Sequence, residues 1–299
     1  MWFRNLRLYR LSRNWDMTSA RLAEQLGAHP LQPCGSQDMI SRGWVTPRFA
    51  GEFVRAVDRR WLIALGVEQK LLPAGVIRQT TQERAAQIEV EQARKLGRKE
   101  IRDLRERVTQ ELLPRAFSQR RTTWAWIDPA NGWLILDAGS DARAEEFIET
   151  LLKCVPGMPL RPLQTHVSPV TAMTEWLASG DAPSGFGIDE DLELRAVTPA
   201  NATIRYAHHA LEGKEIREHI GNGKTVTKLG LTWSDRISFV FTEKLQIKRL
   251  GFLDIIREQA ESVENADEQF DLDFTLMSGE AARLLDDLLV ALGGDTQPE

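Results

Sequence analysis

The chain has 299 residues, with 38 Lys and Arg against 43 Asp and Glu, so its formal net charge is −5. A hydrophobic fraction of 42% and a charged fraction of 27% are typical of globular proteins and favour neither a disordered nor a fibrous chain. The length is enough for two domains and a small insertion. No run of about 18 apolar residues is present, so no membrane-spanning helix is expected. The cysteines, Cys34 and Cys154, form no disulfide or metal-binding pattern and fit a reducing cytoplasm.

The charge is divided unevenly along the chain. Residues 1–121 hold 23 basic and 13 acidic side chains, a net of +10, and residues 122–299 hold 15 and 30, a net of −15. Residues 195–249 carry a net charge of +5, whereas residues 254–299 carry −11. Because charges act over about 8 Å in physiological salt, such blocks create separate local fields. A negative net charge therefore does not exclude a polyanionic partner, although ordinary solvated helix faces would give the same pattern.

The first third of the chain predicts strands and one short helix. Alternating apolar and polar residues at 3–11 predict a strand that opens a sheet, and residues 18–27 predict a helix. Residues 53–57 and 61–67 predict two strands joined by a short connection.

A long helical segment interrupts the strands between about residues 79 and 113. Its second half carries apolar residues at spacings of three and four, which form one stripe on a helix: Ile101, Leu104, Val108 and Leu112. Gly97 lies in the middle of the segment. A glycine inside a helix costs about 1 kcal/mol, and the run is longer than most helices, so we predict a hairpin of two helices.

Strands return after Pro114. Residues 122–127 and 133–138 flank a turn and predict a hairpin, followed by a helix at 142–154. Prolines and a glycine between 156 and 162 then mark a boundary.

The second half mixes strands and helices in the same way. Strands are predicted at 191–197, 203–207, 226–233, 237–241, 245–252 and 270–276, and helices around Trp176, at 211–220, from Leu253 and at 279–292. This mixture predicts the α+β class, with two mixed or antiparallel sheet-plus-helix domains and a helical tip inserted in the first. The predicted division is a central sheet domain at 1–76 and 118–160, a helical tip insertion at 77–117 and a base domain at 161–299.

The sequence offers little support for catalysis. Gly223-Lys224-Thr225 matches the end of a phosphate-binding loop, but the first glycine of that motif would fall at Glu218, and the segment follows a helix instead of a strand. The histidines show no zinc-ligand spacing, and no Gly-x-Ser-x-Gly segment is present. We therefore expect no enzyme activity, no cofactor and no bound metal. The alternative is a metal-dependent nuclease that uses Asp271, Asp273 or Glu280, although acidic residues on a strand are more often a solvated face.

The remaining functional signal is a set of basic side chains. Lysine and arginine neutralise phosphates and release counterions, which gives affinity for nucleic acid without sequence recognition. The candidates near the helical insertion are Arg94, Lys95, Arg98, Lys99, Arg102, Arg115, Arg120 and Arg121. The candidates in the second half are Arg205, Lys214, Lys224, Lys228, Lys248 and Arg249. For each residue alone, an ordinary surface charge is the simpler interpretation.

Several segments together resemble the RdgC family of bacterial recombination-associated proteins. They include Trp2-Phe3-Arg4-Asn5-Leu6 and the runs at 33–39, 91–96, 112–118, 174–176, 223–229 and 291–294. The segments occur in the family's order from end to end, so the resemblance covers essentially the whole chain.

The resemblance implies a ring-shaped homodimer that binds double-stranded DNA with little sequence preference and restrains the RecA recombinase. Such a protein is expected in the cytoplasm, associated with the nucleoid and not with a membrane. By the same resemblance, Phe117, with Leu113 beside it, lies at the tip contact that closes the ring, and Lys224 matches a lysine implicated in DNA contact. Two histidines, His208 and His209, stand where some relatives carry a Lys-Gln pair.

We expect the cationic side chains to share one inner wall and the acidic segment at 254–299 to face away from DNA. A further alternative is an adaptor that meets RecA and has no direct contact with DNA.

Overall fold

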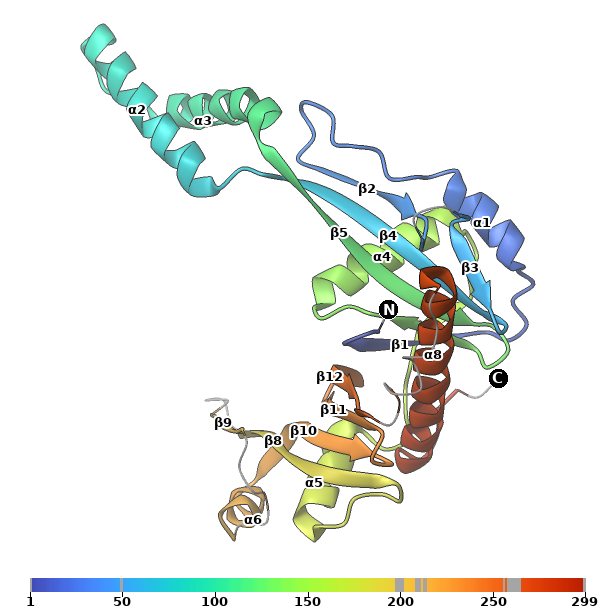
Figure 1. Ribbon diagram of the computed structural model, residues 1–299. Coiled ribbons are helices and arrows are strands. Elements are labelled where there is room, and N and C mark those ends of the chain that lie inside the picture. The colour runs from blue at the N-terminus through green and yellow to red at the C-terminus, as the bar shows by residue number, and fades with distance from the viewer. Residues whose placement is uncertain are drawn as a thin grey trace.

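The computed structural model describes residues 2–48, 51–196, 202–207, 211, 214–254, 256 and 265–297. Within these residues the chain forms twelve strands in one sheet, seven α-helices and one short 3-10 helix. Figure 1 shows the overall shape, an arc with a pair of helices at one end and a group of strands and helices at the other. The predicted α+β class is confirmed.

The strands are β1 (Leu6–Leu11), β2 (Ile40–Val45), β3 (Val54–Val57), β4 (Arg60–Leu71), β5 (Phe117–Asp128), β6 (Trp133–Leu136), β7 (Leu160–Pro162), β8 (Phe186–Ala196), β9 (Thr203–Tyr206), β10 (Lys224–Trp233), β11 (Ile237–Thr242) and β12 (Gln246–Phe252). The helices are α1 (Ser19–Gly27), α2 (Ala74–Gln92), α3 (Arg98–Leu112), η1 (Leu113–Arg115), α4 (Asp141–Cys154), α5 (Pro169–Ser179), α6 (Lys214–Gly221) and α8 (Ala266–Ala291).

The sheet is antiparallel and continuous through the arc. Its order is β2-β4-β5-β6-β1-β12-β11-β10-β8-β9, with β3 beside β4 and β7 beside β1. Leu6 of β1 pairs with Ile247 of β12, and this ladder joins the two halves. One sheet therefore replaces the two sheets predicted, and the pairing leaves neither half with an open edge at this point. The division into a central domain and a base domain stays a prediction.

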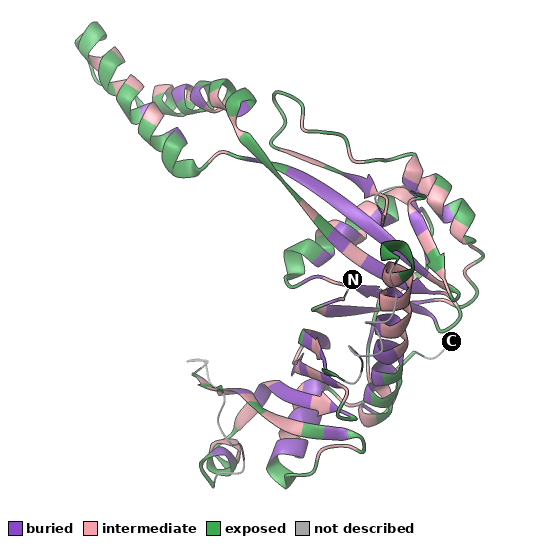
Figure 2. Cartoon of the chain, viewed as in Figure 1, coloured by how far each residue is buried: buried purple, intermediate pink, exposed green. Residues whose placement is uncertain are grey.

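The helices α2 and α3 form a hairpin inserted between the paired strands β4 and β5, which confirms the predicted break. Ala93 ends α2 in the left-handed conformation with φ 49°, and Gly97 precedes the first turn of α3. Ile77, Leu104 and Val108 form a small core between the two helices. Most of the hairpin surface is exposed or half-buried, as Figure 2 shows.

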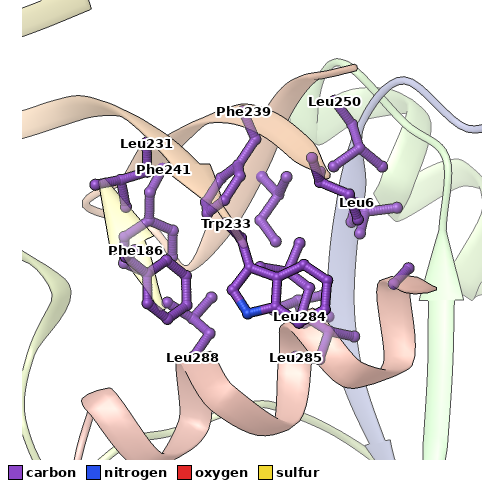
Figure 3. Packing of buried hydrophobic residues seen from close by; sticks show 14 of the residues in the cluster. Leu6, Phe186, Leu231, Trp233, Phe239, Phe241, Leu250, Leu284, Leu285 and Leu288 are labelled. Carbon is purple, nitrogen blue, oxygen red and sulfur yellow. The ribbon is translucent and has the colours of Figure 1, made fainter. Parts of the chain in front are cut away.

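Two hydrophobic clusters lie on opposite faces of the sheet. One cluster packs α5 and α8 against strands of both halves, and the other packs α1 and α4 against strands of the first half. In Figure 3, leucines of α8 face aromatic side chains of the sheet: Leu284, Leu285 and Leu288 against Phe186, Trp233 and Phe239.

The face of β8–β12 that lies opposite α5 and α8 is named the base face. The first turn of α4 reaches its border, where Asp141 accepts hydrogen bonds from Lys244 and Gln246. Figure 1 places α4 toward the hollow side of the arc and α8 on its outer side. The base face and α4 therefore share the hollow side.

The predicted strand at 270–276 is wrong, because these residues belong to the single helix α8. The alternation of Phe270, Leu272 and Phe274 resembles a strand, but buried residues continue at helical spacing through Met277 and Ala281. Packing of this stripe against the sheet decides the conformation. The strand β2 was not predicted, and most of the helix expected from Leu253 lies outside the described residues.

Candidate nucleic-acid interface

A row of charged residues crosses three neighbouring strands on the base face. Lys228 of β10 pairs directly with Glu193 of β8, and Glu193 pairs directly with Arg205 of β9. Leu192 and Leu194 on either side of Glu193 are buried in the cluster beneath α5 and α8. Because successive side chains of a strand point to opposite faces, Glu193 and its two partners lie on the other face.

Glu193 holds the two cations of this row. Its Oε2 accepts hydrogen bonds from Lys228 Nζ at 2.7 Å and from Arg205 Nε at 2.8 Å. Burial alone would raise the pKa of Glu193, but the hydrogen bonds from Lys228, Thr227 and Arg205 outweigh it, and the pKa is lowered. The side chain of Glu193 is 5% exposed, whereas that of Arg205 is 74% exposed. An ionised, covered carboxylate therefore supports cations that face solvent.

The row borders a hollow of about 300 Å³. Its polar lining includes Asn5, Asp191, Glu193, Arg205, Lys228, Lys248 and Arg249. Burial lowers the pKa of Lys248, and the positive charges of Arg7 and Lys228 lower it further. Lys248 therefore lies among other cations, and the hollow also holds the carboxylates of Glu193 and Asp191, of which Asp191 pairs with Arg249 at 3.3 Å.

A β-bulge determines which lysines of β10 reach the base face. The register shifts between Val226 and Lys228, so that two steps along β10 match one step along β8. Lys228 therefore faces Glu193, whereas Lys224 shares the face of the buried Val226. Lys224 Nζ lies 3.3 Å from His219 Nδ1 of α6. The structure thus brings Arg205, Lys228, Lys248 and Arg249 together and leaves Lys224 beside α6.

The cations predicted in the first half lie elsewhere on the arc. Arg98 begins α3 and Arg115 lies in η1, both exposed at the helical tip. Arg120 and Arg121 of β5 form ion pairs with Glu68 and Glu146, respectively. The charges of these two β5 arginines are therefore partly neutralised within the chain.

Further candidates named from the sequence also belong to the tip or to α6. Arg94 forms an ion pair with Glu100, and Arg102 lies near Asp103. Lys95 and Lys99 are exposed between and at the start of the tip helices. Lys214 is the first residue of α6, outside the base face.

The hollow side of the arc also carries negative charge. Glu145 and Glu149 of α4 are exposed, and they line one surface together with Arg143 and Lys153 of the same helix. Where the acidic C-terminal segment is described, its helix α8 packs on the face of the sheet opposite the base face. The inner wall is therefore not uniformly basic, because along α4 the carboxylates are mixed with the cations Arg143 and Lys153.

Phe117 and Leu113 differ sharply in exposure. Phe117 is 83% exposed at the start of β5, opposite Leu71, which is 50% exposed. Leu113 is 3% exposed, and its carbonyl oxygen accepts a hydrogen bond from Lys70 Nζ. Phe117 and Leu71 thus form an apolar patch where the tip meets the sheet, while Leu113 belongs to the interior beside it.

The carboxylates of the nuclease alternative all lie on α8 and have partners. Asp271 is paired with Arg55, and Asp273 accepts a hydrogen bond from Gln269 Nε2 at 2.9 Å. Glu280 is buried and paired with two arginines, Arg236 and Arg283. Among the residues that the structure describes, no group of three His, Cys, Asp or Glu side chains could hold a metal ion.

Sequence reasoning did not identify Glu193. The only local signal is the alternation Leu192-Glu193-Leu194, which places an acid on the polar face of a strand. Its partners become visible only with the register of β9 and β10. His208 and His209 lie outside the described residues.

The comparisons with known proteins cover the chain from end to end. A family model described as "Putative exonuclease, RdgC" matches residues 1–295. A recombination-associated protein RdgC from Dechloromonas aromatica (strain RCB) is 53% identical over 299 residues, which cover 99% of this chain and 98% of that protein. The protein of the same name from Janthinobacterium sp. (strain Marseille) is 51% identical over 298 residues, 99% of each chain.

A third relative with this name, from Herminiimonas arsenicoxydans, is 50% identical over 296 residues, 99% of each chain. No helix in the described part of the chain has the length and apolar character needed to cross a membrane. The family match and the identities near one half over the full length lead to one conclusion: this chain belongs to the RdgC family.

Proposed function

We propose that this protein binds double-stranded DNA without sequence preference, as a ring-shaped homodimer that encircles the duplex and restrains RecA-dependent recombination. The observation that carries the proposal is the base face, where Arg205, Lys228, Lys248 and Arg249 surround one hollow on the inner side of the arc. The names of the relatives, which are recombination-associated proteins, support the same assignment. The proposed location is the cytoplasm, on the nucleoid.

The chemistry of the base face suits contact with the DNA backbone. Lysine and arginine bind phosphate oxygens through charge-assisted hydrogen bonds, and no base-reading element is needed for such contacts. The base pairs can be distinguished only in the grooves of the duplex. Cations that contact phosphates and no base edges therefore bind any sequence with similar affinity.

The shape of the chain supports encirclement. The arc in Figure 1 is open on the side of the base face, and a second copy could close it into a ring. The exposed patch of Phe117 and Leu71 at the root of the tip offers an apolar contact for such closure. A closed ring stays on a duplex without tight binding, because it leaves only by opening or by reaching an end.

The number of candidate contacts sets the expected salt dependence. Four cations per protomer give at most about eight phosphate contacts for a dimer, so log K plotted against log salt should have a slope no steeper than about −7. The surface along α4 mixes carboxylates with Arg143 and Lys153, so it is not counted among the phosphate contacts.

The test is a titration of fluorescent linear duplex and of nicked circular DNA across a range of salt concentrations. For a dimer, Lys248→Gln should make the slope of log K against log salt shallower by about 2. Arg21→Gln removes an exposed charge from α1 and should leave this slope unchanged. A flat salt plot for the unmodified protein would exclude DNA binding and favour the RecA adaptor. Strand scission in the presence of Mg²⁺ that is lost in Asp271→Asn would favour the nuclease.

Restraint of recombination is tested with RecA itself. Protein loaded on the duplex should slow RecA-driven strand exchange, and Lys248→Gln should relieve this inhibition in proportion to its loss of DNA binding. Inhibition that persists in full at salt concentrations where the protein no longer binds DNA would contradict a mechanism that acts through the duplex.

A further inference from the structure

A buried carboxylate at the centre of the base face has no obvious place in a surface for phosphates. Glu193 lies between Lys228 and Arg205 in the cross-strand row, and its negative charge opposes an approaching phosphate. Covering a carboxylate without strong partners also costs free energy. The contacts of Glu193 therefore need an explanation beyond the attraction of DNA.

The two oxygens of Glu193 have separate partners. Oε1 accepts a hydrogen bond from Thr227 Oγ1 at 2.9 Å and lies 3.5 Å from Arg195 Nη2. Oε2 accepts hydrogen bonds from both Lys228 Nζ and Arg205 Nε. One oxygen thus fixes the carboxylate in the sheet, and the other holds the two candidate DNA-binding cations side by side.

The two cations keep most of their hydrogen-bonding capacity. An ammonium group carries three N–H donors and a guanidinium group five, so one bond to Glu193 leaves further donors on each. The side chains of Lys228 and Arg205 are 38% and 74% exposed, which leaves these donors accessible from the hollow side. Both side chains are long and would otherwise sample many rotamers.

We propose that Glu193 is a positioning residue that orders Lys228 and Arg205 in advance as a paired site for one backbone phosphate. This inference rests on the proposed function. Ordering two long side chains before binding avoids an entropic loss that corresponds to a factor of roughly 2 to 10 for each.

Glu193→Gln distinguishes positioning from simple charge by the sign of its effect. The substitution keeps the size of the side chain and the contact with Thr227, and it removes one negative charge from the interface. If only charge matters, the affinity for DNA should rise. If Glu193 positions the cations, affinity should fall by about tenfold and the salt dependence should become shallower, because the two ordered phosphate contacts loosen.

Glu145→Gln on α4 is the matched control. It removes the same charge from the same side of the arc, and the structure describes no ion pair of Glu145 with the candidate cations. We expect it to bind DNA as tightly as the unmodified protein or up to about twofold more tightly. Thr227→Val keeps every charge and removes the hydroxyl that orients Oε1, so it should weaken binding in the same direction as Glu193→Gln by about two- to threefold.

A double-variant comparison separates positioning from a general effect on folding. In a background of Lys228→Gln and Arg205→Gln, adding Glu193→Gln should cause no further loss of affinity. A tenfold loss in this background, or binding by Glu193→Gln that is tighter than normal, would overturn the positioning role while the proposed function stands. Failure of the unmodified protein to bind DNA in a salt-dependent manner would instead overturn the proposed function. Thermal unfolding checks that each variant is folded before its affinity is compared.

Discussion

Phe117→Ala should open the proposed ring without weakening the fold of the chain. Phe117 is 83% exposed, so its truncation removes little buried surface, and the free energy of unfolding should change by less than about 0.5 kcal/mol. In a closed ring the same side chain would be covered. Burying a phenylalanine contributes about 2 kcal/mol, or about 4 kcal/mol for the two copies of a symmetric contact. The equilibrium between closed and open rings should therefore shift by about a thousandfold.

Retention on nicked circular DNA after a salt challenge measures this shift, since a closed ring cannot slide off a circle. Phe117→Ala should dissociate from circles nearly as fast as from short linear duplexes. Leu113→Ala is the first control, because Leu113 is 3% exposed and its truncation should cost about 2–5 kcal/mol of stability instead. Val90→Ala is the second, because Val90 is 82% exposed at the far end of α2. Unchanged retention of Phe117→Ala, or equal loss in Val90→Ala, would refute this contact.

Three further predictions concern the fold. Glu280→Gln should destabilise the chain by about 2–4 kcal/mol in urea unfolding, because Glu280 is buried and accepts hydrogen bonds from Arg236 at 2.9 and 2.8 Å; a change below about 0.5 kcal/mol would contradict this. The hydrogen bonds from Arg94 and the Gly97 amide lower the pKa of Glu100 to about 2, below its unfolded value of about 4.3. Their contribution to stability is therefore present above pH about 4.3 and lost as pH falls toward 2, and an NMR titration should show this pKa rising in Arg94→Gln. Lys70→Met should remove the 3.1 Å hydrogen bond to the Leu113 carbonyl and lower the free energy of unfolding by about 1–3 kcal/mol. Hydrogen exchange of the backbone amides near η1 should become faster.

Local chemistry made several elements predictable from the sequence. The break at Gly97 follows from helix propensity, and the hairpin around residues 128–132 follows from turn residues between two apolar runs. These signals lie within a few residues of the structure that they specify. The strand predicted at 270–276 failed because a short window cannot separate an alternating pattern from a helical stripe that extends much further along α8.

The candidate interface could be predicted only in part, because its geometry depends on strand register. Residue types and local charge identified Arg205, Lys228 and Lys248, and the structure gathers these three. An even spacing would place Lys224 and Lys228 on the same face of β10, but the bulge at Val226–Lys228 puts them on opposite faces. Nothing near Glu193 in the sequence specifies its neighbours on β9 and β10.

In the proposed ring, affinity for DNA and retention on DNA would depend on different parts of the protein. In the proposed complex the cations of the base face would attract the duplex, while the surface of α4 mixes Glu145 and Glu149 with Arg143 and Lys153 and would add little net attraction. A small number of phosphate contacts permits sliding, and closure of the ring would supply the retention that affinity does not. Phe117→Ala should therefore change retention on circles and leave the salt slope intact, whereas Lys248→Gln should change the slope and preserve the preference for circles. A single variant that altered both in parallel would show that closure and phosphate contact are one event, and the separation argued from this wall would fail.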